Sequence, residues 1–177
     1  LILHPMKVAL LGLDHPHSGI LYTTLENLPE VTAISLWDAD PNVVARTPFA
    51  RKPKSTDISV HLDTILADPE LQFAIVCAHH DLAAALCRQV IQAGKHLLAE
   101  KPVGFNTAQI LELHQAATVA GIVASVLYVR RAHPCMVAAR ELVQAGSLGP
   151  LFSLECRFLT TQVKFRQPES WLFRQDQ

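Results

Sequence analysis

Strand-like and helix-like segments alternate along most of this chain of 177 residues, and that order limits the fold more than any other feature. The first apolar run, residues 7–13, is continuous after its lysine, which is typical of a strand buried on both faces of a parallel sheet. Parallel strands need crossover connections, and the intervening helices supply them. The order therefore predicts an α/β fold, a doubly wound parallel sheet of the Rossmann type.

The predicted elements follow one another from residue 7 to residue 129. Strands are expected at residues 7–13, 31–37, 59–61, 73–78, 96–100 and 122–129. Helices are expected around residues 21–28, 63–67, 81–94 and 106–121. Asp81 and either Asn106 or Thr107 are the expected N-caps of the last two helices, which Gly94 and Gly121 are expected to close.

The pattern changes from about residue 128. A further helix is expected at residues 133–149 and a half-exposed strand at 150–158, and the remaining residues do not reach a second core. We therefore expect one complete domain over residues 6–125. Residues 126–177 are expected to begin a second α/β domain that this chain leaves incomplete.

Charge and cysteine usage exclude several classes of partner. The formal net charge is −1, so the chain lacks the basic surface that nucleic acid or an anionic membrane would require. No apolar stretch is long enough for a membrane span. None of the four cysteines belongs to a C-x-x-C pair, which predicts buried, reduced thiols in a cytoplasmic protein.

The segment GLDHPHSG, residues 12–19, lies where a dinucleotide-binding chain carries G-x-G-x-x-G. Gly12 keeps the first glycine, which makes the tight turn, whereas Asp14 and His17 stand at the second and third positions. A carboxylate ~4 Å from a phosphate oxygen costs about 4 kcal/mol at an effective dielectric constant of about 20. Asp14 therefore conflicts with a pyrophosphate unless its charge is offset.

Several offsets are open at this loop. Asp14 can turn inward to cap the first helix. His15 and His17 can carry protons beside the anion near neutral pH, and Ser18 and Gly19 can supply a hydroxyl and close packing. We favour a modified cofactor loop that still binds the pyrophosphate.

Two other strand ends are expected to contact the cofactor. Asp38 closes the second strand, where an acidic residue binds the adenosine ribose hydroxyls and repels a 2′-phosphate, so NAD is favoured over NADP. The alternative is that Asp38 is only a turn residue of the DADP segment. The fourth strand ends at Ala78 and His79, beside the first strand in the usual strand order.

A metal site is the competing hypothesis for the same crevice. Carboxylate and imidazole ligands suit zinc or another divalent ion. The residues that could converge there are Asp14, His15, His17, His79 and His80. Their spacing matches no known metal motif, so we assign no metal ligand.

Residues 61–113 resemble the central signature of the Gfo/Idh/MocA oxidoreductases. The phrase ADPE precedes the fourth strand, and AGKH leads through the fifth strand into Glu100-Lys101-Pro102, the Glu-Lys-Pro motif of that family. Residues 128–134, YVRRAHP, and residues 141–158 are similar to the family's landmarks at the junction with its second domain. Without this context, Glu-Lys-Pro would be an ordinary charged turn.

The resemblance implies an NAD(H)- or NADP(H)-binding Rossmann domain and a second domain that carries the substrate pocket and often the oligomer contact. A homo-oligomer is expected for the full-length form. It also implies sugars, inositols and related polyols as substrates, oxidised or reduced by hydride transfer. The family's second catalytic group, an aspartate or histidine, would follow the last residue of this chain, and about half of the family's usual length would be missing.

Site residues carry over by position. Lys101 is the expected active-site lysine, bonded to the reacting oxygen and also beside the cofactor, and Glu100 is expected near the nicotinamide ribose. A lysine can stabilise a developing alkoxide as a point charge. The bond before Pro102 can be cis. Tyr128 and Arg130 end the sixth strand and would face the substrate, although a surface salt bridge is an alternative for the arginine.

Two functions therefore remain as hypotheses. The first is an NAD-dependent oxidoreductase acting on a sugar, inositol or related polyol, although these 177 residues alone are not expected to turn over. The second is a non-catalytic binding module on the same scaffold. Glu100-Lys101-Pro102 favours the enzyme, whereas Asp14 and His79 favour the module.

Overall fold

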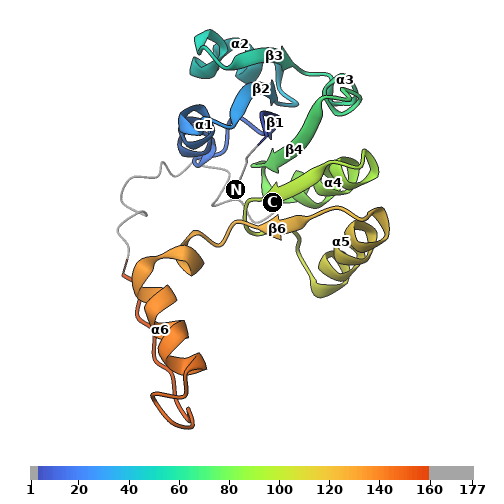
Figure 1. The fold of residues 1–177 in the computed structure, drawn as a ribbon. Coiled ribbons are helices and arrows are strands. Elements are labelled where there is room, and N and C mark those ends of the chain that lie inside the picture. The colour runs from blue at the N-terminus through green and yellow to red at the C-terminus, as the bar shows by residue number, and fades with distance from the viewer. Residues whose placement is uncertain (1–3, 160–177) are drawn as a thin grey trace. The chain divides into compact units, whose positions relative to one another are not determined.

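A computed structural model describes residues 4–159, and most of them form a six-stranded parallel sheet with its helices (Figure 1). The elements of this sheet are, in chain order, β1 (Met6–Leu11), α1 (Ser18–Asn27), β2 (Val31–Trp37), α2 (Pro41–Arg46), the 3-10 helix η1 (Pro48–Arg51), β3 (Ser55–Ser59), α3 (Leu62–Leu66), β4 (Leu71–Val76), α4 (His80–Gln92), β5 (His96–Ala99), α5 (Thr107–Ala120) and β6 (Ala124–Val126). The strand order is β3-β2-β1-β4-β5-β6. The predicted doubly wound α/β fold is confirmed.

The strand order reverses at β1, and this reversal positions the candidate site. β1 pairs in parallel with both β2 and β4, so their last residues, Leu11, Trp37 and Val76, lie in register at one edge of the sheet. Connections leave such a point in opposite directions and open a crevice beyond the carboxyl ends of the strands. Ligands of doubly wound sheets bind in this crevice.

Two apolar cores, one on each face of the sheet, hold the strands and helices together. Along β1, Val8 and Leu10 belong to the core that includes α1, whereas Ala9 and Leu11 belong to the core that includes α3, α4 and α5. Successive side chains of a strand point to opposite faces, which explains the unbroken apolar run. Each fully buried leucine contributes roughly 2 kcal/mol to stability.

Strand pairing moves or shortens two predicted strands. The third strand spans Ser55–Ser59 instead of 59–61, because it pairs with β2 along residues 34–37. The sixth spans only Ala124–Val126 instead of 122–129, because β5 offers it three paired residues. Between β2 and β3, where the sequence predicts no helix, the structure has α2 and η1.

Helix ends agree with the prediction at α5 and disagree at the start of α4. The Asn106 side chain caps α5 by accepting a hydrogen bond from the Gln109 N–H at 3.0 Å. Gly94 and Gly121 follow their helices at φ of 69° and 67°, as expected for closing glycines. The prediction that Asp81 caps α4 is wrong, because α4 begins at the preceding residue and its N-cap is His79.

The chain divides into two compact units, residues 1–127 and 128–177. The described part of the second unit contains a 3-10 helix, η2 (Val129–Ala132), and α6 (Pro134–Gln144). The predicted strand at 150–158 is wrong: residues 150–159 form no strand, and Phe152 is fully exposed. In the described part of this unit no neighbouring strand offers the backbone hydrogen bonds that a strand requires. Residues 160–177 lie outside the described residues.

The cysteine prediction holds for two of the four residues. Cys77 and Cys87 are buried free thiols, and burial raises the pKa of each to about 12. Cys135 and Cys156 are exposed instead, so the prediction that they are buried is wrong. Both belong to the second unit, and no residue in its described part is buried. Within residues 4–159, no helix is both long and apolar enough to cross a lipid bilayer.

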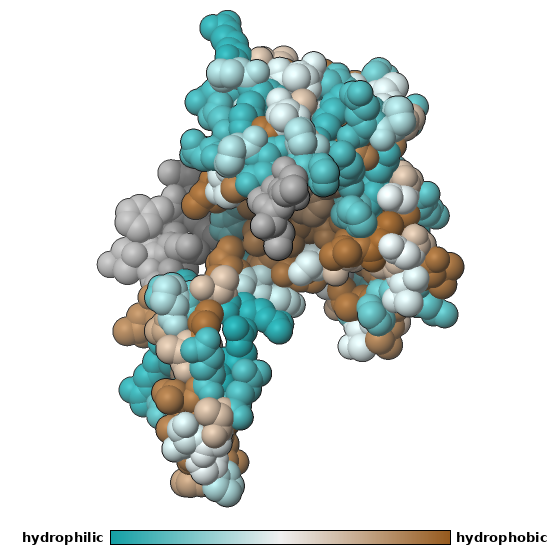
Figure 2. Space-filling model, in the orientation of Figure 1, coloured by the Kyte–Doolittle hydropathy of each residue, from teal (hydrophilic) through white to brown (hydrophobic). Residues whose placement is uncertain are grey.

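Apolar side chains are also exposed on the first unit. Figure 2 shows hydrophobic residues gathered over α4 and α5, on the right of the view. The large exposed apolar residues of this region are Leu82, Ile110, Leu111, Val119 and Val123. α5 buries only Leu113 and Ala117. It therefore covers its side of the sheet with a narrow face.

Candidate functional site

Gly12 forms the floor of the crevice at the end of β1. Its φ is +99°, a region that L-residues with a side chain rarely adopt. Its N–H donates to the Trp37 carbonyl at 2.8 Å, and a Cβ on Gly12 would lie 2.3 Å from the Cys77 carbonyl oxygen. The predicted tight turn is present, and the close approach of β1 and β4 requires a glycine here.

The loop after Gly12 uses several of its polar groups internally. The His17 N–H donates to Nδ1 of His15 at 3.1 Å, and the Ser18 N–H donates to the His15 carbonyl at 2.9 Å. The Ser18 hydroxyl donates to the carbonyls of Leu13 and His15 at 2.8 and 2.7 Å. This hydroxyl therefore holds the loop in shape, and the prediction that it serves the phosphate is wrong.

Two other expectations for the loop are also wrong. α1 begins at Ser18 with His17 at its N-cap position, so Asp14 does not cap the helix. The residues from His15 to His17 separate Asp14 from the first turn of α1. Gly19 provides no close packing, because a Cβ there would meet no atom within 4 Å.

His15 is buried and neutral. Burial lowers its pKa from 6.5 to about 3, and the nearby His17 and Lys101 lower it further. Its Nδ1 accepts the His17 N–H, which requires that nitrogen to be unprotonated. The expectation that His15 carries a proton beside the anion near neutral pH is therefore wrong.

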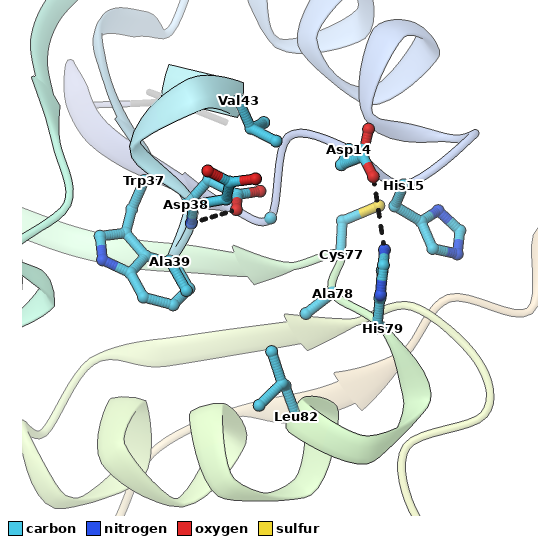
Figure 3. A pocket seen from close by; sticks show the side chains of 12 residues that line it. Asp14, His15, Trp37, Asp38, Ala39, Val43, Cys77, Ala78, His79 and Leu82 are labelled. Carbon is cyan, nitrogen blue, oxygen red and sulfur yellow. Dashed lines mark hydrogen bonds and ion pairs between the residues drawn. The ribbon is translucent and has the colours of Figure 1, made fainter. Parts of the chain in front are cut away.

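Asp14 faces the loop that follows β4. Its carboxylate Oδ2 lies 3.7 Å from Nε2 of His79, and the two side chains point toward each other in Figure 3. The Asp14 side chain is 62% exposed, so water also screens its charge. His80, the residue after His79, begins α4. The pKa of His80 is lowered mainly by burial and, second, by the charge of Lys101.

Asp38 is held by two backbone groups at the end of β2. Its Oδ2 accepts the Leu13 N–H at 2.7 Å, and its Oδ1 accepts the Asp40 N–H at 3.0 Å. The preceding Trp37 donates its indole N–H to the Val60 carbonyl at 3.0 Å. Asp38 thus joins the loop after β1 to the loop after β2, which is a stronger constraint than an isolated turn residue would have.

These strand ends line one pocket at the switch point (Figure 3). Its lining residues are Gly12, Asp14, His15, Trp37, Asp38, Ala39, Asp40, Val43, Cys77, Ala78, His79 and Leu82. Six of the predicted cofactor residues are among them: Gly12, Asp14, His15, Asp38, Ala78 and His79. Sequence reasoning did not select Asp40, Val43 or Leu82. Asp40 caps α2 and is followed by Pro41 at the first helical position, which is a helix-start signal.

The other three predicted cofactor residues form a separate cluster around one carboxylate oxygen. Oε1 of Glu100 lies 2.9 Å from Nδ1 of His17 and 3.4 Å from Nζ of Lys101. The Glu100 side chain is only 4% exposed, and its Oε2 has no hydrogen-bond partner among the described residues. The Lys101–Pro102 bond is cis, as the sequence suggested. An unpaired buried carboxylate oxygen is costly unless a ligand or a proton satisfies it.

Tyr128 and Arg130 lie in the second unit, so their assignment to the substrate stays a prediction. They do not end the sixth strand as expected, because β6 stops at Val126 and η2 follows. Arg130 stacks its guanidinium on the Phe158 ring, 3.7 Å from the centroid. This contact differs from the surface salt bridge that was the alternative for Arg130.

The metal alternative gains no support from the geometry. Among residues 4–159, no three or more His, Cys, Asp or Glu side chains are arranged to hold a metal ion. The structure brings Asp14 and His79 near each other, whereas His17 turns to Glu100. The histidines named in this hypothesis contact different partners and do not converge on one point.

The pocket suits a dinucleotide. It lies at the carboxyl ends of β1, β2 and β4, and Trp37, Val43 and Leu82 supply apolar walls for a flat ring. Asp38 supplies a fixed acceptor for sugar hydroxyls. The buried, unpartnered Oε2 of Glu100 offers a further acceptor. Fold and site together define a dinucleotide-binding Rossmann domain with an altered phosphate loop.

Comparison with known families leads to the same class. The model of the Gfo/Idh/MocA family, described as "Oxidoreductase family, NAD-binding Rossmann fold", matches residues 7–128. This chain belongs to that family.

Individual relatives cover most of this chain but only part of their own lengths. The D-xylose dehydrogenase of Paenarthrobacter nicotinovorans is 29% identical over 132 residues, which are 72% of this chain and 34% of the relative. The uncharacterized oxidoreductase YhhX of Escherichia coli is 32% identical over 97 residues, 55% of this chain and 28% of that protein. The structure of GenD2 from gentamicin A biosynthesis, in complex with NAD, aligns with a TM-score of 0.71 and 26% identity over 83% of this chain and 41% of GenD2. The chain thus spans about a third of the length of these curated relatives.

Proposed function

We propose that this chain binds NAD(H) and forms the cofactor-binding part of an oxidoreductase that transfers hydride to or from a sugar, inositol or related polyol. The observation that carries the proposal is the fixed carboxylate of Asp38 in a pocket at the switch point of the sheet. Family membership supports the cofactor class, and the D-xylose dehydrogenase relative supports the substrate class.

Asp38 is the proposed basis for preferring NAD over NADP. Its two oxygens are already held by backbone N–H groups, and the remaining acceptor capacity suits the ribose hydroxyls. Asp40 also lines the pocket and adds a second negative charge. A 2′-phosphate would meet both carboxylates, which disfavours NADP.

Lys101 is the proposed catalytic residue. NAD, when bound there, would supply the hydride acceptor for the alcohol carbon. As an ammonium group, Nζ of Lys101 donates a hydrogen bond to the substrate oxygen as negative charge develops there; as a neutral amine, the same nitrogen takes the hydroxyl proton. Glu100 holds this ammonium group through Oε1 and keeps it near the cofactor. Tyr128 and Arg130 are proposed to contact the substrate.

Oligomer contacts and location follow the family pattern in this proposal. We infer a homo-oligomer assembled through a second domain and a cytoplasmic location for the enzyme.

Titration with NADH and then NADPH tests the cofactor proposal. Trp37 lines the pocket, so excitation of tryptophan should produce nicotinamide emission when NADH binds. We expect saturable energy transfer with higher affinity for NADH than for NADPH, and Trp37→Phe should remove most of the transfer. A flat titration of a chain shown to be folded by circular dichroism would contradict the proposal.

A non-catalytic binding module is the second candidate, favoured by the carboxylate of Asp14 at the pocket. Turnover separates the two functions, and it is measured on the full-length form, because these 177 residues alone are not expected to turn over. Reduction of NAD by a panel of aldoses and inositols, lost in Lys101→Gln, supports the enzyme. Tight NADH binding without turnover of any member of the panel supports the module.

A further inference from the structure

The buried carboxylate of Glu100 needs a positive partner. A charge removed from water is costly unless a counter-charge or several hydrogen bonds compensate it. Glu100 is 4% exposed, and its Oε2 has no partner among residues 4–159. Compensation therefore falls on the two groups that reach Oε1.

Of those two groups, His17 is the closer. Its Nδ1 lies 2.9 Å from Oε1, whereas Nζ of Lys101 lies 3.4 Å away on a side chain that is half exposed. A carboxylate at hydrogen-bond distance stabilises a protonated imidazole. His17 also stands at the N-terminus of α1, at the third glycine position of the phosphate loop.

Other titratable groups around His17 do not provide the same pairing. They are His15 on its own loop, Lys101 beside Glu100 at the end of β5, His79 and His80 at the start of α4, and Asp14 opposite His79. Burial keeps His15 neutral, and burial together with Lys101 disfavours the cation at His80. Nε2 of His79 lies 3.7 Å from Oδ2 of Asp14, so a positive charge on His79 would be paired with the exposed carboxylate of Asp14.

We propose that His17 binds the phosphate charge of the dinucleotide as an imidazolium ion held by Glu100, so that NADH binding takes up a proton wherever His17 is not already protonated. This inference rests on the proposed function, because it assumes that the pyrophosphate approaches the loop after β1. The positive charge compensates for the backbone approach that the second glycine permits and that Asp14 replaces in this loop. It also compensates the charge of the buried Glu100 carboxylate.

The pH dependence has a definite sign. A ligand that favours the protonated form takes up protons, so its affinity falls as pH rises. One fully linked proton would change affinity by about tenfold per pH unit, which is the upper limit. We expect a partial effect, about threefold to tenfold weaker NADH binding at pH 8 than at pH 6.

Calorimetry at pH 7 in buffers of different ionisation enthalpy, combined with NADH titrations at pH 6 and pH 8, tests the proposal. His17→Gln keeps a donor for Glu100 and cannot titrate. It should lose both the proton uptake and the pH dependence. His114→Gln changes an exposed histidine of α5 and should keep both.

Each other outcome overturns the proposal in a recognisable way. NADH binding with no pH dependence, or with the same dependence in His17→Gln, overturns the role of His17 and leaves the proposed function intact. Loss of the dependence in His79→Gln instead assigns the cation to His79. No NADH binding at either pH in a folded chain overturns this inference and the proposed function together.

Discussion

Oε1 of Glu100 lies 2.9 Å from Nδ1 of His17, so a buried carboxylate at the end of β5 is tied to the loop after β1. Eighty-three positions separate the two residues along the chain. The contact makes the phosphate loop and the Glu-Lys-Pro motif one structural unit. A substitution in either segment is therefore expected to alter the stability of the other.

His17→Ala tests this tie through stability. The substitution leaves Glu100 with Lys101 as its nearest positive group, and the free energy of unfolding should fall by about 2 kcal/mol, as for loss of a charged hydrogen bond. Urea denaturation at pH 7 measures the change. His17→Gln, which still donates, should recover part of the loss, and equal stability of His17→Ala and the parent chain would contradict the prediction.

Gly12→Ala should be strongly destabilising. The new Cβ would lie 2.3 Å from the Cys77 carbonyl oxygen, at a φ of +99°. Strain and overlap together should cost about 3 kcal/mol or more in the free energy of unfolding. Gly19→Ala is the matched control: its Cβ meets no atom within 4 Å, and alanine should stabilise α1 by up to about 1 kcal/mol. Similar denaturation midpoints for the two variants would refute the contrast.

His15 should make the chain less stable in mild acid. Its folded-state pKa of about 3 lies below the unfolded value of 6.5, so the unfolded chain binds more protons between these limits. The free energy of unfolding should therefore fall as pH drops below about 6.5, by at most ~1.4 kcal/mol per pH unit from this group. His15→Asn should show a shallower decline, measured by urea denaturation from pH 7 to pH 5. A parallel decline in both chains would exclude His15 as the source.

Asp38→Asn should weaken the preference for NADH over NADPH. The amide oxygen can still accept the Leu13 N–H, but the negative charge that repels a 2′-phosphate is gone. We expect the affinity ratio to move toward NADPH by about tenfold, measured by energy transfer from Trp37. Asp57→Asn on the exposed side of β3 is the control and should leave the ratio unchanged. An unchanged ratio in Asp38→Asn would show that cofactor choice lies elsewhere.

Asp14→Asn should strengthen NADH binding modestly. The carboxylate is 62% exposed and lies 3.7 Å from His79, so the cost of ~4 kcal/mol for an unscreened pair near a phosphate is an upper limit. An increase of about threefold to tenfold in affinity at low salt is expected, shrinking at high salt. The change in NADH affinity in the double variant Asp14→Asn/His79→Gln should be smaller than the sum of the changes measured in the two single variants. Weaker binding in Asp14→Asn would show that this carboxylate assists the ligand.

The sheet could be predicted because its physical cause is local to each segment. β1 contributes alternate residues, such as Val8 and Ala9, to cores on opposite faces, and such a strand must be apolar throughout. The pocket edge followed from the strand order, which placed Gly12, Asp38 and Ala78 together. A pattern of period two in residues 150–158 was insufficient, because a strand also needs a partner.

Proton states and side-chain pairing in the loop could not be predicted. His15 and His17 are two residues apart in one short segment, yet burial makes the first neutral, and the second turns to Glu100. Nothing in the spacing of residues 12–19 distinguishes these outcomes. They depend on which ring the rest of the fold covers.

Both oxygens of Asp38 are fixed by backbone N–H groups before any ligand arrives. A side chain that must be ordered on binding reduces affinity through lost rotamer freedom, by roughly 0.5–1.5 kcal/mol. Asp38 has no such freedom left to lose. The part of the pocket that meets the adenosine sugar is thus preorganised, and discrimination at the ribose should carry little entropic penalty.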